Sequence, residues 1–281
     1  MITALAIGHV TLDTYPDGLK VGGSVAYAAR TWQALGARTR LITAAGPDFP
    51  VAPVAGWQVR PSAQTTRFTN RYDAAGHRQQ HLAAQADPLE APPKSATESG
   101  TCSTLPPHDV AFLCPVLQDF EPAPWIAALA GTRLVAAGLQ GWLKRAGPDG
   151  AVIHGPERAP ADFRGLHAAF LSEEDLAGRL DWLDALCSVV PLVYLTRGRA
   201  GALLFRADCI TRIGTCPAQE VDPTGAGDTF AAATLVALAG GRSPEAAARL
   251  GAAAASIAVE HRAAAPVAAL RRAQERLAWV A

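Results

Sequence analysis

The chain has 281 residues, of which 49% are hydrophobic and 18% are charged. A chain of this length and composition can bury a full core, as one large α/β domain or as a domain with a small appendage, and this excludes a disordered protein. The formal net charge is zero and the sequence pI is about 7.0, so the chain lacks the electrostatic footprint of a nucleic-acid-binding protein.

The cysteines and the amino-terminal residues indicate the cellular compartment of the protein. Five cysteines are scattered without a C-x-x-C pair, which favours a reducing compartment and argues against a zinc site. Met1–Val10 has no basic start and is typical of a buried strand instead of a signal peptide. No apolar run reaches membrane-spanning length, so we expect a cytoplasmic protein.

The first fifty residues alternate between strand and helix patterns. A short apolar strand is expected over 2–10. Gly22, Gly23 and Ser24 then open a helix that extends to about Leu35, with Ser24 as its cap. The next strand is expected over 40–45, and this strand–helix–strand order is typical of a parallel α/β sheet.

Residues 64–82 follow a different pattern, in which polar side chains alternate with few apolar ones around a turn. This pattern predicts a polar hairpin that projects from the main sheet as a lid, beside the segment 11–21. The Pro-, Ser- and Thr-rich stretch from Pro88 to Pro107 is expected to be irregular surface.

Regular alternation resumes after residue 107. Apolar runs predict strands over 110–113, 134–137, 168–171 and 189–196. Helical periodicity predicts helices over 125–130, 173–186, 228–239, 244–260 and 267–280. The sequence therefore predicts a single domain, 1–281, with a three-layer α/β/α fold and a small β lid formed by about 11–22 and 64–83.

The most informative segment is Val221–Phe230, with the sequence VDPTGAGDTF, which reads as a loop that runs into a helix. Gly225 and Gly227 allow a tight turn with unpaired N–H groups, and the helix amino terminus adds partial positive charge. Asp228 at that terminus can accept a proton from an attacking hydroxyl while the N–H groups hold a phosphate. In a generic G-x-G-D string, Asp228 would simply complement the helix dipole.

The whole segment resembles the D-x-T-G-A-G-D-x-F signature of the ribokinase-like carbohydrate kinases, the PfkB family. A Rossmann dinucleotide fingerprint matches less well, because Phe230 takes the place of the third glycine. A Walker-type loop is absent because the chain has no Gly-Lys pair. The resemblance implies an ATP-dependent kinase with Asp228 as catalytic base. The amides of Ala226, Gly227 and Asp228 would form its anion hole, in the catalytic turn that begins at Gly225.

The amino-terminal half resembles the family's acceptor site. Gly22 and Gly23 begin a string similar to its G-G-x-x-x-N loop, and Asp13 stands where family members hold substrate hydroxyls. Without that context, Asp13 is equally well an ordinary turn residue. Tyr27 replaces the usual Asn, which argues against a ribose-like pattern of hydroxyl contacts.

Further matches concern the phosphoryl donor and its cations. The resemblance implies that ATP lies along residues of a T-x-G-x-x-G turn, the signature loop and a small-residue helix: Thr196, Gly198, Gly201, Thr224, Ala252 and Ser256. Asp175 stands where an N-x-x-E motif organises water around Mg²⁺, although acidic residues there also favour a helix start. Asp222 is retained near a monovalent-cation site of ribokinase, whereas Ala263 lies in a segment without the expected glycine. This leaves monovalent-cation activation open.

The acceptor is indicated less specifically. Within the superfamily, the lid sequence and Gln140-Gly141-Trp142-Leu143 resemble the inositol-kinase-like branch. Asn70, Arg71 and Gln140 would then contact the hydroxyls of a cyclitol, and the alternative is a solvated lid face and a simple turn. A nucleoside acceptor and a catalytically silent sugar- or nucleotide-binding regulator remain alternatives. The expected partners are a polyol and ATP, without nucleic acid or membrane, in a monomer or homodimer.

Overall fold

The computed structural model describes residues 1–15, 17–51, 56–72, 78–92, 95–97, 100–102, 105–155, 158–207 and 209–280. Within these residues, a nine-stranded sheet has the order β17-β16-β15-β14-β11-β10-β1-β4-β5. Its strands are β1 (Thr3–Ile7), β4 (Arg38–Ala45), β5 (Trp57–Pro61), β10 (Val110–Leu113), β11 (Leu134–Gly138), β14 (Ala168–Ser172), β15 (Leu192–Thr196), β16 (Ala202–Arg206) and β17 (Cys209–Ile213). The strands from β5 to β15 are parallel, and β16 and β17 are antiparallel additions.

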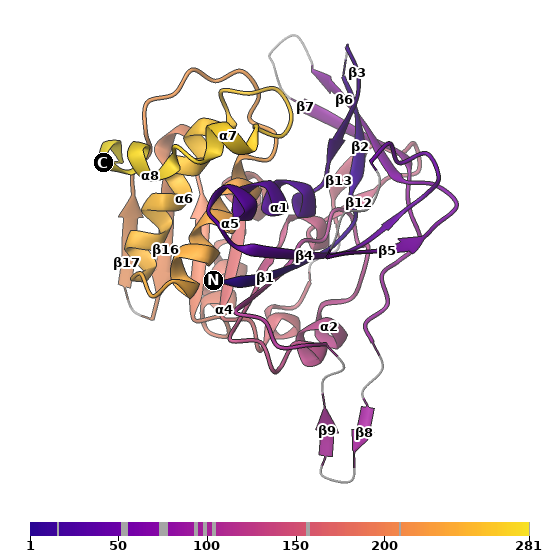
Figure 1. The fold of residues 1–281 in the computed structure, drawn as a ribbon, viewed down its shortest axis with the longest axis horizontal. Coiled ribbons are helices and arrows are strands. Elements are labelled where there is room, and N and C mark those ends of the chain that lie inside the picture. Colours follow the sequence, from indigo (N-terminus) through magenta and orange to yellow (C-terminus); the bar gives the residue numbers. More distant parts are fainter. Residues whose placement is uncertain are drawn as a thin grey trace.

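Helices cover both faces of this sheet (Figure 1). One face packs against α1 (Ser24–Ala34), α5 (Ala226–Ala239) and α6 (Pro244–Ala258). The other packs against α2 (Pro122–Ala128), α4 (Leu180–Cys187) and a 3₁₀ turn, η2 (Pro160–Phe163). Successive strand residues face opposite cores: Phe112 of β10 belongs to the first core and Leu113 to the second. The three-layer α/β/α prediction is confirmed.

A four-stranded sheet, which we call the small sheet, stands at one end of the molecule (Figure 1). Its strands in spatial order are β3 (Gly18–Gly22), β2 (Thr11–Tyr15), β6 (Thr66–Tyr72) and β7 (Arg78–Ala84). Both segments that the sequence predicts for a lid contribute to it. They are joined by parallel pairing of β2 with β6, in which Thr11 lies opposite Thr66.

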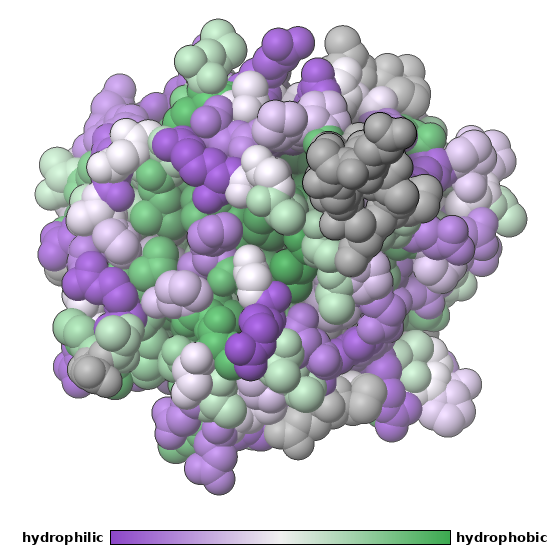
Figure 2. Space-filling view, turned by 90° about the horizontal axis from the view of Figure 1, so that it is seen from below, coloured by the Kyte–Doolittle hydropathy of each residue, from purple (hydrophilic) through white to green (hydrophobic). Residues whose placement is uncertain are grey.

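Two short hairpins complete the described sheets. Strands β12 (Lys144–Ala146) and β13 (Val152–His154) form a ribbon that a bridge between His81 and Ala151 links to β7. Strands β8 (Ser95–Thr97) and β9 (Gly100–Cys102) project from the rest of the chain (Figure 1). From the side of α2, hydrophilic and hydrophobic residues are interspersed over the visible face (Figure 2), which is usual because folded surfaces remain largely apolar.

Several expected boundaries are wrong for local reasons. The helix expected over 173–186 is broken into α3 (Glu173–Leu176) and α4, because Ala177 and Gly178 adopt left-handed backbone conformations. The expected cap of α1 is also wrong, since Gly23 takes the cap position and Ser24 begins the helix. Strand β5 and the β8–β9 hairpin were not anticipated.

The carboxyl-terminal segment likewise differs from the single helix expected over 267–280. It forms α7 (Val267–Leu270), α8 (Ala273–Arg276) and a 3₁₀ turn, η4 (Leu277–Trp279).

Among the described residues, no helix is long and apolar enough to cross a membrane. The cysteines whose side chains the structure describes are free thiols: Cys114, Cys187, Cys209 and Cys216.

Candidate active site

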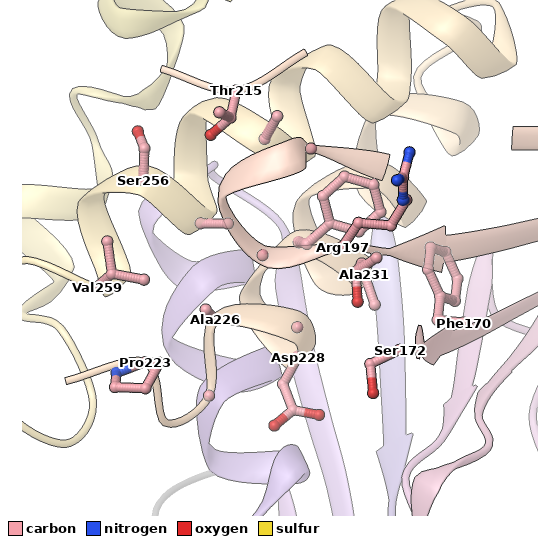
Figure 3. Close-up of a pocket in the computed structure, with 18 of the residues that line it drawn as sticks. Phe170, Ser172, Arg197, Thr215, Pro223, Ala226, Asp228, Ala231, Ser256 and Val259 are labelled. Atoms are coloured by element: carbon pink, nitrogen blue, oxygen red, sulfur yellow. The ribbon is translucent and has the colours of Figure 1, made fainter. Parts of the chain in front are cut away.

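A cavity of about 840 Å³ opens at the carboxyl ends of the parallel strands. Its wall is formed by the ends of β11, β14 and β15, by the amino terminus of α5 and by residues of α6 (Figure 3). Phe112 and Phe170 form part of its apolar lining. Open α/β sheets bind their ligands at this edge, so the topology places the cavity where a substrate site is expected.

The turn before α5 has the geometry that the signature string requires. Gly225 is the N-cap and has φ of 77°, a left-handed conformation that glycine adopts without strain. Asp228 lies in the first turn of α5 and its carboxylate projects away from the helix (Figure 3). The Ala226 amide already donates to the carbonyl of Pro223 at 3.2 Å. The Ala226 amide thus has a partner within the turn, and the anion hole formed by this amide and the next two stays a prediction.

Tyr27 of α1 packs directly against this turn. A Cβ atom on Gly225 would overlap the Tyr27 ring, so the ring explains why the position is glycine. Tyr27 is 4% exposed, and its hydroxyl has no hydrogen-bond partner within the described residues. Burial raises the pKa of Tyr27 well above its usual value, and the charges of Asp13 and Asp228 raise it further. The hydroxyl is thus a buried polar group near both carboxylates.

Other residues expected to contact the acceptor lie where the small sheet meets α1. Asp13 accepts a hydrogen bond from Thr11 Oγ1 at 3.1 Å, and its carboxylate covers Gly22 so closely that a Cβ there would overlap it. Gly23 has φ of 87° and leaves no room for a side chain against the carbonyl of His9. These contacts hold Asp13 at the base of the small sheet.

Two other predicted acceptor contacts come from different elements. Gln140, at the start of the 3₁₀ turn η1 (Gln140–Trp142) after β11, lines the cavity and donates through Nε2 to Ser24 Oγ at 3.2 Å. Asn70 lies on β6, and its Oδ1 is buried without a partner among the described residues. The side chain of Arg71 lies outside the described residues. Asp13, Gly22, Gly23, Tyr27 and Asn70 are absent from the described lining of the 840 Å³ cavity, and Tyr27 connects them to it through Gly225.

The residues expected to bind ATP all line the cavity: Thr196, Gly198, Gly201, Thr224, Ala252 and Ser256. The hydroxyls of Thr196 and Ser256 donate to backbone carbonyls. Thr196 Oγ1 donates to the carbonyl of Leu171 at 3.4 Å, and Ser256 Oγ donates to that of Ala253 at 2.8 Å. Both positions therefore shape the groove more than they offer free donors.

Asp175 has partners that the sequence did not reveal. Its Oδ2 accepts from the amide and the hydroxyl of Ser172 at 3.1 and 2.7 Å, which forms a capping box at the start of α3. Its Oδ1 lies 2.7 Å from Lys144 Nζ. Because both oxygens have protein partners, an action of Asp175 on magnesium through water stays a prediction.

The charges around the cavity suit a cation-bound polyphosphate. Three cationic side chains line it, Lys144, Arg197 and Arg199, together with five carboxylates, Glu173, Glu174, Asp175, Glu220 and Asp228. This acidic surplus would repel a bare polyphosphate but suits a hard divalent cation, which prefers oxygen ligands and water. The donor set therefore fits Mg²⁺ bound mainly by phosphate oxygens.

Asp222, by contrast, is occupied by protein donors. It accepts hydrogen bonds from the amides of Thr224 and Ala263 at 2.9 and 3.0 Å and from the hydroxyl of Tyr15, on β2, at 2.8 Å. Burial opposes ionisation, but these hydrogen bonds hold the pKa of Asp222 below its usual range. These contacts join the small sheet to the signature loop, and activation by a monovalent cation stays a prediction.

Comparisons with known proteins agree with this geometry. Residues 165–269 match the family described as pfkB family carbohydrate kinase. The chain is 26% identical over 280 residues to the cytidine kinase of Thermococcus kodakarensis, covering 89% of this chain and 94% of that protein. It is 27% identical over 252 residues to the inositol 3-kinase of Arabidopsis thaliana, covering 86% of this chain and 68% of that protein.

The fold also matches solved structures. One is a pyrophosphate-dependent kinase in the ribokinase family, complexed with a pyrophosphate analog and myo-inositol, with a TM-score of 0.76 and 21% identity. The match covers 97% of this chain and 99% of that one, and at this identity it establishes the fold. Residues 165–269 thus match the pfkB family, and together with the shared fold these matches support a ribokinase-like carbohydrate kinase of that family.

Proposed function

We propose that this kinase transfers the γ-phosphoryl group of ATP to a hydroxyl of a polyol, with a cyclitol such as myo-inositol as the favoured acceptor. One observation carries the proposal. Asp228 stands at the amino terminus of α5, in a cavity lined by every residue expected to bind the nucleotide, and Tyr27 packs against the same turn with a buried hydroxyl that has no partner among the described residues.

The reaction follows from these positions. Asp228 accepts the proton of the acceptor hydroxyl, whose oxygen then forms a bond to the γ-phosphorus. The bond from that phosphorus to the β,γ-bridging oxygen breaks, and ADP leaves with the electron pair. The amide of Gly227 and the partial positive charge of the α5 terminus stabilise the charge on the transferred group.

Magnesium would supply charge neutralisation on the phosphates, held by phosphate oxygens and water beside the acidic lining of the cavity. The protein's own residues perform the other tasks. Gly225 lets the turn approach the phosphates. On α6, Ala252 would form part of the apolar wall beside the adenine ring of ATP.

The acceptor side favours a polyol over a nucleoside. The Tyr27 hydroxyl and Asn70 Oδ1 are buried polar atoms without partners among the described residues, and acceptor hydroxyls would satisfy both. On the small sheet, the aromatic side chains that the structure describes are engaged: Phe68 is 1% exposed and Tyr15 binds Asp222. Neither is placed to stack on a base, although similarity to a cytidine kinase keeps a nucleoside as the second candidate.

An ADP-release screen tests the proposal with myo-inositol, other cyclitols, pentoses, hexoses and nucleosides as acceptors. We expect a cyclitol to give the highest kcat/KM, and a nucleoside with a higher value would overturn the choice of acceptor. Asp228→Asn should fold and bind ATP but lose about 10²–10⁴ in kcat, as removal of a general base does. Near-normal turnover in that variant would reject Asp228 as the base.

A further inference from the structure

Lys144 is the most buried of the three cationic side chains that line the described part of the cavity. Its side chain is 16% exposed, compared with 31% for Arg197 and 82% for Arg199. Its Nζ lies 2.7 Å from Oδ1 of Asp175, whose side chain is 6% exposed. Burying an ion pair costs desolvation energy that the pair alone often does not recover. A buried lysine at a cavity wall therefore needs an explanation.

Both members of the pair are held by the backbone around them. The Lys144 carbonyl accepts a hydrogen bond from Gln118 Nε2 at 2.9 Å, and Lys144 pairs with His154 across the β12–β13 ribbon. Asp175 is fixed by its capping box with Ser172. The backbone of the lysine and the carboxylate of Asp175 thus have defined positions, and the ammonium group lies at the cavity wall beside Asp175.

The cap of α3 does not account for the lysine. The capping box uses only Oδ2 of Asp175, so α3 would keep its cap without Lys144. Oδ1 has an ion pair with Lys144 but no aligned hydrogen-bond donor among the described residues. An ammonium carries three N–H donors on a flexible stem, so Lys144 can bind an oxygen anion in the cavity while it stays near Asp175.

We propose that Lys144 binds the polyphosphate of the phosphoryl donor and that Asp175 is a positioning residue that holds the ammonium at the cavity wall. This inference rests on the proposed function and adds a residue that no sequence motif indicated. Lys144 lines the same cavity as Gly227 and Asp228, so its positive charge faces the space in which the phosphates must lie. An ammonium at that wall offsets part of the acidic surplus of the cavity.

Calorimetric titration of the purified full-length protein with ADP and with adenosine, in the presence of magnesium, tests the proposal. Adenosine lacks the phosphates, so the ratio of the two affinities isolates the phosphate contacts. Lys144→Met should weaken ADP binding by about tenfold to a hundredfold, the usual effect of losing a charge-assisted hydrogen bond, and should leave adenosine binding unchanged. Lys144→Arg should restore part of the loss.

Arg145→Met is the matched control, because Arg145 is the next residue on β12 and its side chain is exposed. It removes the same formal charge and should not change either affinity. An equal loss in both variants would overturn the proposal, because it would reflect the general field of the protein and no specific contact.

The double variant Lys144→Met/Asp175→Asn separates binding from stability. Lys144→Met alone leaves a buried carboxylate without its counter-ion and should lower the melting temperature. In the double variant the melting temperature should recover while ADP binding stays weak. Recovery of both properties would show that Lys144 serves only as a counter-ion. Wild-type protein that binds ADP no better than adenosine would contradict the proposed function, and this inference with it.

Discussion

Replacing Tyr27 by phenylalanine should make the protein more stable and less active. The Tyr27 hydroxyl is buried and has no hydrogen-bond partner within the described residues. A buried hydroxyl without a partner costs roughly 1–3 kcal/mol, and the small void left by its removal returns part of that. We therefore expect Tyr27→Phe to gain about 1 kcal/mol, which corresponds to a rise of roughly 2–4 °C in melting temperature.

Tyr194→Phe is the matched control for this substitution. Tyr194 is also fully buried, but its hydroxyl donates to the carbonyl of Pro244 at 3.3 Å. Removing a hydroxyl that has a partner should cost about 0.5–1.5 kcal/mol, so the two substitutions should shift the melting temperature in opposite directions.

The activity of Tyr27→Phe completes the test. If the hydroxyl binds the acceptor, kcat/KM for the acceptor identified by the screen should fall by about tenfold, while KM for ATP stays unchanged. The acceptor should also raise the melting temperature of the wild type more than that of the variant. A Tyr27→Phe protein that is less stable than the wild type without acceptor, or that keeps its kcat/KM, would refute the reasoning.

Two other predictions concern the signature loop. Gly225→Ala combines left-handed strain of about 1–2 kcal/mol with overlap of the Tyr27 ring, so it should lose both stability and turnover in thermal melts and rate assays. Tyr27→Ala removes a buried ring and is itself destabilising, so the loss in the double variant should be smaller than the sum of the two single losses; strictly additive losses would contradict the overlap. Tyr15→Phe should lower stability by about 1 kcal/mol through the lost hydrogen bond to Asp222. Folding lowers the pKa of Asp222, so the stability difference between the wild type and Tyr15→Phe should be complete above about pH 4. The difference should shrink as the pH falls through the folded-state pKa. Denaturant melts at several pH values measure it, and a difference that does not change with pH would show that the bond is absent in solution.

The sequence predicted those features that depend on local backbone chemistry. The glycines of the signature string require a turn and a helix start, and the structure has Gly225 as the N-cap of α5. The acidic residues after β14 likewise indicated a helix start, and α3 begins there with Asp175 in a capping box. The break after α3 depends on Ala177 in a left-handed conformation, which is uncommon for alanine and carries no sequence signal.

Contacts between distant segments were beyond prediction. Tyr15 and Asp222 are separated by 207 positions, and they meet only because the small sheet folds over the carboxyl edge of the large one. Lys144 follows the turn after β11, and Asp175 follows β14, so their pairing depends on the adjacency of these two strands. No pattern in either segment indicates such a partner, because strand order is a property of the whole sheet.

The polar groups proposed to bind the acceptor and those proposed to bind the donor differ in whether they already have protein partners. On the acceptor side, the Tyr27 hydroxyl and Asn70 Oδ1 are buried without partners among the described residues, so a ligand with hydroxyl groups relieves an existing cost. On the donor side, each cation that lines the described cavity already has a carboxylate partner, as Lys144 has Asp175. Phosphates must share or displace these carboxylates. Each phosphate contact therefore releases less free energy than a contact between an acceptor hydroxyl and an unpartnered polar group. We therefore expect such a site to select its acceptor through buried hydrogen bonds and to hold its donor loosely enough to release ADP after transfer.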